Sequence, residues 1–226
     1  MKTHIIALTA TLALCVFLSP PTQNSALATQ VTVRQALADA AGARAWEEVS
    51  RVEFTWTHHK KKLSRSYLWE RDKERVTVTL DTRAPKEQVT IDLTSAEDRQ
   101  TTAYKAFIND SYWGFFSLYV GADSNVNVTQ LGVGGKLYGG ATRAIDVKYG
   151  DVGHTPGDRY ILHTDEGFVP LAWLYYPGGQ DSPKLITTRS SYISSGGVSI
   201  PTSFKAIDAD GSPGDEIISI SGVSIQ

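Results

Sequence analysis

The feature that most constrains the fold of this chain is an alternation of apolar and polar side chains that recurs along most of its length. It is clearest between Arg143 and Tyr176, where Ile145, Val147 and Tyr149 alternate with polar neighbours. A period of two places such side chains on opposite faces of a β-strand. Clusters of Gly and Asp separate successive runs, as they do in antiparallel hairpins. The pattern therefore predicts an antiparallel meander.

About eleven such runs predict a sheet large enough to curl rather than stay flat. The concave face of a curled sheet needs a cover of side chains, helices or ligand. We therefore expect an α+β fold, a curved antiparallel sheet (an open, unclosed β-barrel) of about 11 strands covered by two or three helices. The runs are residues 52–57, 67–70, 75–80, 88–93, 126–133, 145–149, 159–163, 168–176, 184–193, 198–206 and 216–225.

Two segments are the predicted helical covers. Thr32–Ser50 is rich in Ala, Leu, Arg and Glu, and Gly42 interrupts it, so two short helices and one kinked helix both fit. Ser95–Asp98 has the form of a capping box, which predicts a helix running to about Ile108. The polar triplet Asn109–Ser111 is predicted to break that helix.

The first 28 residues have the pattern of a secretory signal peptide. Lys2 supplies the basic start, Ile5–Leu18 is an apolar stretch, and Ala26–Ala28 is an A-x-A cleavage site. The apolar stretch is too short to span a bilayer comfortably. We therefore expect cleavage after Ala28, a single domain over residues 29–226, and a periplasmic or extracellular location.

Cys15 raises the alternative of a lipoprotein signal, with Leu12–Cys15 as its lipobox. Leu14 stands where a small residue is expected, and apolar sequence continues past the cysteine, so we favour ordinary cleavage. Cleavage removes the single cysteine of the chain, which excludes disulfides and thiolate chemistry in the mature protein. A formal net charge of −2 gives no reason to expect a nucleic-acid partner. We expect a monomer without a transmembrane segment in the mature chain.

The segment His154–Asp158 is the strongest candidate for catalysis or metal binding, with Asp151 and His163 as further ligands. Its spacing matches no standard zinc pattern, and a rigid turn explains the Pro and Asp equally well. We prefer the turn, and keep a hydrolase with His154 and Asp158 as an alternative.

Three other polar motifs are also interpreted as turns. His58–Lys62 suits a solvated hairpin tip. Gly132–Gly140 lacks the Lys-Ser/Thr that completes a phosphate-binding loop. Asp208–Gly214 lacks the terminal Glu of a calcium loop at the required spacing. The chain also has no G-x-S-x-G motif, so we expect no enzyme activity, no metal and no cofactor.

Large aromatic side chains are the candidates for a ligand-binding site. They could simply pack between sheet and helices, or they could line an apolar cavity beneath the helices. Gly114 beside a ring cluster suits a movable flap, which favours Trp113 and Phe116. The candidate ligand-binding residues are Trp56, Trp69, Trp113, Phe116, Trp173 and Tyr175.

Three motifs together resemble a family of uncharacterised secreted bacterial proteins, a domain of unknown function. They are Tyr112-Trp113 after a helix, the turn Val152–Tyr160, and Gly197–Pro201. The family is distantly similar to the lipoprotein-carrier (LolA/LolB-like) fold, and the resemblance covers about Ala45 to Ala206. It implies an unclosed barrel with helices as a lid over an apolar cavity, and it supplies no catalytic residues.

Three functions remain open from the sequence. The first is a periplasmic or secreted binding protein for a hydrophobic or amphipathic ligand, such as a lipid or a lipoprotein acyl chain. The second is a non-catalytic structural or interaction protein whose core is filled. The third is the hydrolase. An apolar cavity of adequate volume would favour the first, and convergent polar groups inside it would be needed for the third.

Overall fold

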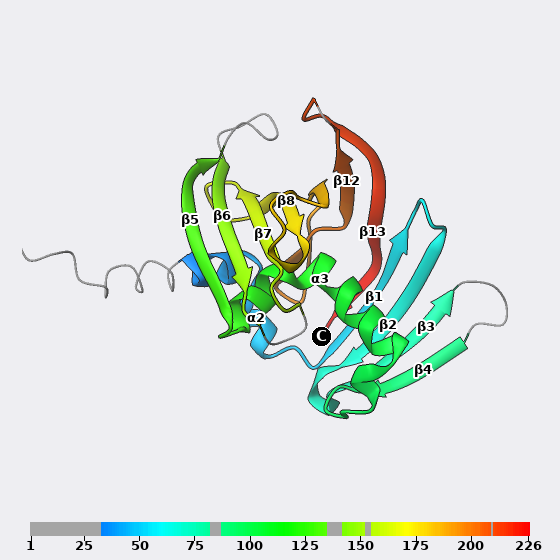
Figure 1. Cartoon of the computed structure of the whole chain (residues 1–226). Coiled ribbons are helices and arrows are strands. Elements are labelled where there is room, and N and C mark those ends of the chain that lie inside the picture. The colour runs from blue at the N-terminus through cyan, green and yellow to red at the C-terminus, as the bar shows by residue number, and fades with distance from the viewer. Residues whose placement is uncertain (1–32, 82–86, 135–141, 152–154, 209) are drawn as a thin grey trace, which may run out of the picture.

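One curved antiparallel sheet organises the chain (Figure 1). The structure, a computed structural model, describes residues 33–81, 87–134, 142–151, 155–208 and 210–226, so the predicted signal segment with Cys15 lies outside it. Eleven strands pair in this sheet, and two more form a separate hairpin. The strands are β1 Arg51–His58, β2 Leu63–Glu70, β3 Arg75–Asp81, β4 Glu87–Asp92, β5 Val126–Gly134, β6 Thr142–Tyr149, β7 Arg159–Thr164, β8 Pro170–Tyr176, β9 Leu185–Thr188, β10 Ile193–Ser195, β11 Val198–Ile200, β12 Ser203–Ile207 and β13 Pro213–Ile225. The predicted fold class is confirmed.

The strand order places the first and last strands side by side near the centre of the sheet. It runs β4-β3-β2-β1-β13-β12-β9-β8-β7-β6-β5, so the predicted meanders are present within each half. The first and last strands pair with each other, with Val52 opposite Ile225. The two edge strands, β4 and β5, are consecutive along the chain, so the segment between them must cross from one edge of the sheet to the other.

Two predicted strands are each divided in the structure. The run 184–193 is divided into β9 and β10, and the run 198–206 is divided into β11 and β12. Ser191 has a φ of 55°, a left-handed conformation that an extended strand does not accommodate. Pro201 stands between β11 and β12 and offers no backbone N–H to a ladder. The intervening pieces fold back as the small β10–β11 hairpin.

The crossing segment is helix α3, Thr102–Ala122, which lies across the concave side of the sheet (Figure 1). The Thr101 hydroxyl caps it by accepting a hydrogen bond from the Tyr104 amide at 3.2 Å. The Ser95 hydroxyl accepts a hydrogen bond from the Asp98 amide, as expected of a capping residue. The element that follows it is only the short 3₁₀ helix Asp98–Gln100. The helix therefore begins later than predicted.

The predicted break at Asn109–Ser111 is wrong, because tertiary contacts hold these polar residues inside the helix. Asp110 is fully buried, and its carboxylate accepts two hydrogen bonds from the Arg65 guanidinium, at 2.6 and 2.8 Å. It accepts a third from the Tyr67 hydroxyl at 2.6 Å. Both donors lie on β2, so this network fastens the middle of α3 to the sheet.

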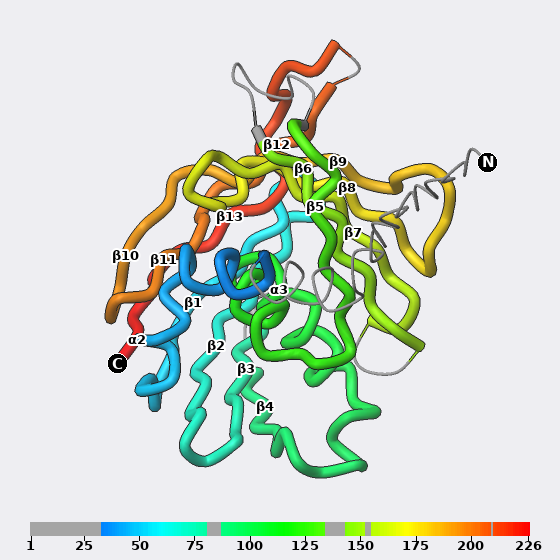
Figure 2. The backbone as a smooth tube through the Cα atoms, turned by 90° about the vertical axis from the view of Figure 1, so that its left-hand side faces the viewer, coloured from blue at the N-terminus to red at the C-terminus, as the bar shows by residue number. Residues whose placement is uncertain are grey.

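The N-terminal cover is two short helices rather than one kinked helix. Residues 33–40 are helical, and α2 spans Ala43–Glu47 beside the β10–β11 hairpin (Figure 2). Gly42 separates them with a φ of 87°, and a Cβ there would lie 2.3 Å from the Gly197 carbonyl oxygen. Glycine is therefore required for both conformation and space. In the described part of the chain, no helix has the length and hydropathy needed to cross a membrane.

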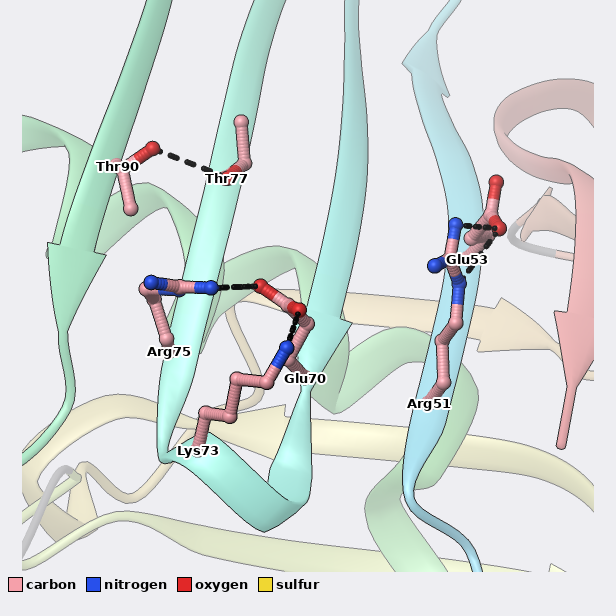
Figure 3. A network of polar contacts seen from close by, with 7 residues as sticks. All are labelled: Arg51, Glu53, Glu70, Lys73, Arg75, Thr77 and Thr90. Carbon is pink, nitrogen blue, oxygen red and sulfur yellow. Dashed lines mark hydrogen bonds and ion pairs between the residues drawn. The ribbon is translucent and has the colours of Figure 1, made fainter.

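The outer face of β1–β4 is polar, and the inner face belongs to the core. Val52, Phe54 and Trp56 are buried on the inner face, as their alternation predicts. Ion pairs and hydroxyl contacts run over the outer face, including Glu70 with Lys73 at 2.6 Å and with Arg75 at 2.8 Å (Figure 3). Exposed pairs of this kind contribute little to stability. The other residues of this surface in Figure 3 are Arg51, Glu53, Thr77 and Thr90.

Candidate functional site

A cleft of about 760 Å³ lies between the N-terminal half of α3 and the β7–β8 side of the sheet. It continues into an inner pocket of about 170 Å³, and the two share five lining residues. The shared residues are Ile108, Asn109, Thr155, Asp158 and Tyr175. The outer cleft is also lined by Arg99, Tyr104, Lys105 and Pro156, and the inner pocket by Tyr112, Trp113, Tyr160, Trp173 and Leu185.

Three of the six candidate ligand-binding residues line this inner pocket: Trp113, Trp173 and Tyr175. The ring centroids of Trp113 and Trp173 are 5.2 Å apart, and one ring comes from α3 and the other from β8. Phe116 lies behind them, completely buried, with its centroid 5.3 Å from that of Trp173. The inner end of the cleft is thus walled by packed rings.

The other two candidates, Trp56 and Trp69, lie on the opposite side of α3 and do not line the cleft. Trp69 packs edge-on against Phe107 at 5.1 Å, and the Arg65 guanidinium lies 4.6 Å above the ring of Trp56. Both indoles are buried parts of the core.

The expectation of a movable flap at Trp113 and Phe116 is wrong. Both residues belong to the middle of α3. Gly114 between them faces β13, where an added Cβ would lie 3.1 Å from Ile220 Cδ1. The glycine therefore allows the helix to approach the sheet closely.

Tyr160 is the functional candidate that the sequence did not single out. Its ring lies 5.0 Å from that of Tyr175 and 5.2 Å from that of Trp173, so it connects the two halves of the pocket wall. Tyr160 and Tyr175 are directly paired across β7 and β8. Tyr160 and Leu162 are two positions apart and are both buried on the inward face of β7. This spacing is the sequence signal that could have identified Tyr160.

Asp158 orders the polar wall of the cleft. One carboxylate oxygen accepts a hydrogen bond from the Tyr175 hydroxyl at 3.0 Å, and the other accepts from the Gly178 amide at 2.8 Å. Burial, reinforced by the neighbouring Asp158 charge, raises the pKa of Tyr175 to about 12. Tyr175 therefore stays a neutral hydroxyl at physiological pH, with its orientation fixed by Asp158.

One further polar group of the pocket lining, the buried Trp173 Nε1, has no hydrogen-bond partner among the described residues. The buried Thr155 hydroxyl lies beside the hydroxyl of Tyr112. Buried polar atoms are usually paired, so unpaired ones in a cavity wall mark places where a ligand or water can bind. The indole N–H of Trp173 is thus available to a molecule in the inner pocket.

The mouth of the cleft carries charge, in contrast with its inner end. Arg99 and Lys105 line the outer part, and Asp158 lies where the two parts meet. The arrangement can hold an apolar segment against the tryptophans while leaving a polar segment near the cations. Among the described residues that line the cleft, no nucleophile is held by a base.

The hydrolase and metal interpretations gain no support from the described residues. His154 lies outside them, and the Asp158 carboxylate is already engaged by Tyr175 and Gly178. His163 is buried, and this burial lowers its pKa. Across the part of the chain that the structure covers, no group of three His, Cys, Asp or Glu side chains could hold a metal ion.

A second apolar cavity of about 270 Å³ lies on the other side of α3. Its walls come from the first turns of the helix and from β2, β3 and β4, and they include Leu80, Val89 and Ala106. It shares no lining residue with the cleft and is therefore a natural control region.

Comparisons with known proteins find similarity to solved structures. No family model matches the chain, and no curated protein matches its sequence. A crystal structure of a DUF1329 family protein from Desulfovibrio piger ATCC 29098 is similar, with a TM-score of 0.47 and 9% sequence identity over 87% of this chain and 92% of that one.

Proposed function

We propose that the mature chain is a periplasmic or secreted binding protein for an amphipathic ligand, such as a lipid or the acyl chain of a lipoprotein, held in the cleft beside α3. The observation that carries this proposal is the two-part cleft, whose inner end is walled by Trp113 and Trp173 and whose mouth carries Arg99 and Lys105. The outer volume of about 760 Å³ lies in the usual range for small-molecule sites.

The inner pocket suits a small apolar segment. Its volume of about 170 Å³ is close to that of engineered apolar cavities which admit a single benzene ring. Burial of roughly 300 Å² of ligand surface in both parts, at about 25 cal/mol/Å², would supply several kcal/mol before ordering costs. The unpaired Trp173 Nε1 would orient a polar group of the ligand.

The test is binding of a fluorescent fatty-acid probe, with native mass spectrometry of the gently purified mature protein to detect a co-purifying lipid. Leu185→Trp fills the inner pocket from β9, and Leu80→Trp fills the separate cavity on the other side of the helix. We expect Leu185→Trp to weaken probe binding at least tenfold, and Leu80→Trp to leave it unchanged.

Two results would count against this assignment. Loss of binding in Leu80→Trp alone would move the site to the other side of α3. A wild-type protein that carries no lipid and takes up no probe would leave the filled-core interaction protein as the better account.

One observation favours that second function. Edge strand β5 exposes Leu131 and Val133, which are 52% and 82% exposed. An exposed apolar edge strand can pair with a strand of another protein. If β5 binds a partner, Val133→Lys should abolish co-purification of that partner while leaving probe binding intact.

A further inference from the structure

One face of helix α3 lines the cleft from its mouth to its inner end. The residues Lys105, Ile108, Asn109 and Tyr112 occupy positions i, i+3, i+4 and i+7, which lie on one side of a helix. Lys105 lines only the outer cleft, and Tyr112 lines only the inner pocket. Ile108 and Asn109 lie between them and line both parts. The lining therefore changes along the helix from a cation to an aromatic ring.

The positive charge at the mouth is not neutralised by the described protein. Arg99 and Lys105 both line the outer cleft, and both are exposed. Neither forms an ion pair with an acidic side chain of the described residues. Arg99 Nε and Nη2 donate to the Leu93 carbonyl oxygen at 3.3 and 3.2 Å, which orients the guanidinium and leaves its charge in place. Two cations without a described counter-charge therefore border the space that a ligand would occupy.

Asp158 supplies the opposite charge farther inside. It lines both parts of the cleft and so marks where they join. Its carboxylate accepts hydrogen bonds from the Tyr175 hydroxyl and the Gly178 amide, two neutral donors that do not cancel its charge. A carboxylate at this point repels an anionic group from the inner pocket, whose Trp113 and Trp173 rings suit an apolar segment. The order of the charges therefore sets the direction in which an anionic amphipath lies.

We propose that the cleft selects an amphipathic molecule with an anionic group, a carboxylate or a phosphate. Arg99 and Lys105 hold this group at the mouth, and the apolar chain extends past Asp158 into the inner pocket. The inference rests on the binding function proposed above and specifies its ligand.

The proposal also distinguishes between the two kinds of ligand named above. A free fatty acid or phospholipid carries an anionic group next to its chain, whereas the acyl chains of a lipoprotein are attached through uncharged ester and amide bonds. A free anionic lipid is therefore the better fit. Helix α3 rises about 10 Å from Lys105 to Tyr112, a spacing that suits a chain of medium length.

The test compares decanoate, decyl phosphate and decanol, which share a ten-carbon chain and differ in their head groups. Calorimetric titration of the mature protein at neutral pH gives the Kd of each. We expect the better of the two anions to bind about fivefold more tightly than decanol, and salt to reduce this difference by screening the exposed cations. The ratio of the two anions identifies the head group as carboxylate or phosphate. Inorganic phosphate should not bind measurably, because the chain supplies most of the affinity. Binding of inorganic phosphate as tight as that of decyl phosphate would overturn the proposal.

Variants assign the preference to the charge at the mouth. Lys105→Met keeps a long, helix-forming side chain without the charge, so it should weaken binding of the anion and leave the Kd of decanol unchanged. Lys105→Glu should abolish the preference for the anion. Lys73→Met is the matched control, since it removes an exposed lysine from the outer face of the sheet, and it should retain the full preference. An equal loss of decanol and anion binding in Lys105→Met would show that the lysine acts through packing, and would overturn the proposal.

Failure of this inference can be told apart from failure of the binding function. Equal affinities for decanol and both anions would overturn the charge selection and leave the binding function intact. Tighter binding of decyltrimethylammonium than of either anion would also overturn it, and would assign the head-group site to Asp158. No binding of any of these compounds, or of the fatty-acid probe, would contradict both proposals.

Discussion

The two sides of helix α3 are built from similar side chains but differ in how their polar groups are satisfied. On the β1–β4 side, Asp110 receives hydrogen bonds from Arg65 and Tyr67. On the β6–β9 side, several buried polar atoms lack such partners. Of the ten buried side-chain nitrogen and oxygen atoms that lack a well-oriented hydrogen bond among the described residues, eight lie in the region from β6 to the residue after β9. The Tyr112 hydroxyl lies beside two of them, on Tyr149 and Thr155. Hydrogen bonding is therefore more complete on the first side of the helix than on the second.

The largest expected effect comes from breaking the satisfied side. Asp110→Ala leaves the Arg65 guanidinium and the Tyr67 hydroxyl without their common acceptor. Loss of one partner of a buried ion pair costs about 3–5 kcal/mol. Chemical denaturation should show that the free energy of unfolding falls by this amount. The control Glu53→Ala, on the exposed face, should leave the free energy of unfolding unchanged. A loss no larger than that of the surface control would mean that the network does not secure α3.

A smaller effect is expected where α3 meets the N-terminal helical segment. A Cβ on Gly121 would lie 2.5 Å from Ala38 Cβ, so Gly121→Ala forces the two helices apart at a cost of about 1–3 kcal/mol. Gly114→Ala is the matched control, because the atom it meets, Ile220 Cδ1 at 3.1 Å, is the end of a side chain that can rotate. Equal losses in denaturation would show that helix packing does not depend on the space at Gly121.

A still smaller effect is expected at the cleft. Tyr175→Phe removes one hydrogen bond to Asp158, and Asp158 keeps the bond from the Gly178 amide. We therefore expect the free energy of unfolding to fall by about 1 kcal/mol. The raised pKa of Tyr175, about 12, also has a pH signature. A group with a raised pKa in the folded state stabilises it fully below its ordinary pKa of 10.0, and this contribution is lost as the pH rises towards 12.

Unfolding midpoints measured across this alkaline range should therefore fall less steeply for Tyr175→Phe than for the wild-type protein. Parallel curves would indicate that Tyr175 is not the group responsible.

The smallest effect is expected on the outer face of β1–β4. Hydrogen bonds from Lys73 and Arg75 lower the pKa of Glu70 to about 2. Glu70 therefore contributes above its ordinary pKa of 4.5, and the contribution disappears as the pH falls towards 2. Glu70→Gln should be indistinguishable from the wild-type protein in stability at neutral pH and should flatten the acid side of the profile slightly. A large fall in the free energy of unfolding of Glu70→Gln at neutral pH would show that this exposed ion-pair network stabilises the fold substantially.

Local patterns predicted the sheet well because one face of most strands is buried. The alternation of Val52, Phe54 and Trp56 corresponds to the buried face of β1. The helix boundary could not be predicted in this way, because the residues that keep Asp110 helical lie on β2, and Arg65 is 45 positions away in the sequence.

The candidate site was predicted only in part for a similar reason. Trp113, Trp173 and Tyr175 are conspicuous in the sequence, and all three line the inner pocket. Trp56 and Trp69 are equally conspicuous but lie across the helix. Which tryptophans share a wall depends on the path of α3 over the sheet, and no local pattern specifies that path. Lys105 lines the mouth of the cleft, but no sequence motif marks it, because its position there also depends on the path of α3.

The pairing of the first and last strands has a mechanical consequence. Val52, near the start of β1, lies opposite Ile225 at the end of β13. A force that pulls the start of β1 away from the end of β13 therefore acts on the terminal pair of one antiparallel ladder. Such a ladder breaks its hydrogen bonds one pair at a time and does not shear them all together. The sheet would then part at its centre into β4–β1 and β13–β5. Helix α3 would be the hinge that still joins them, and the cleft would stay with the larger piece and the helix.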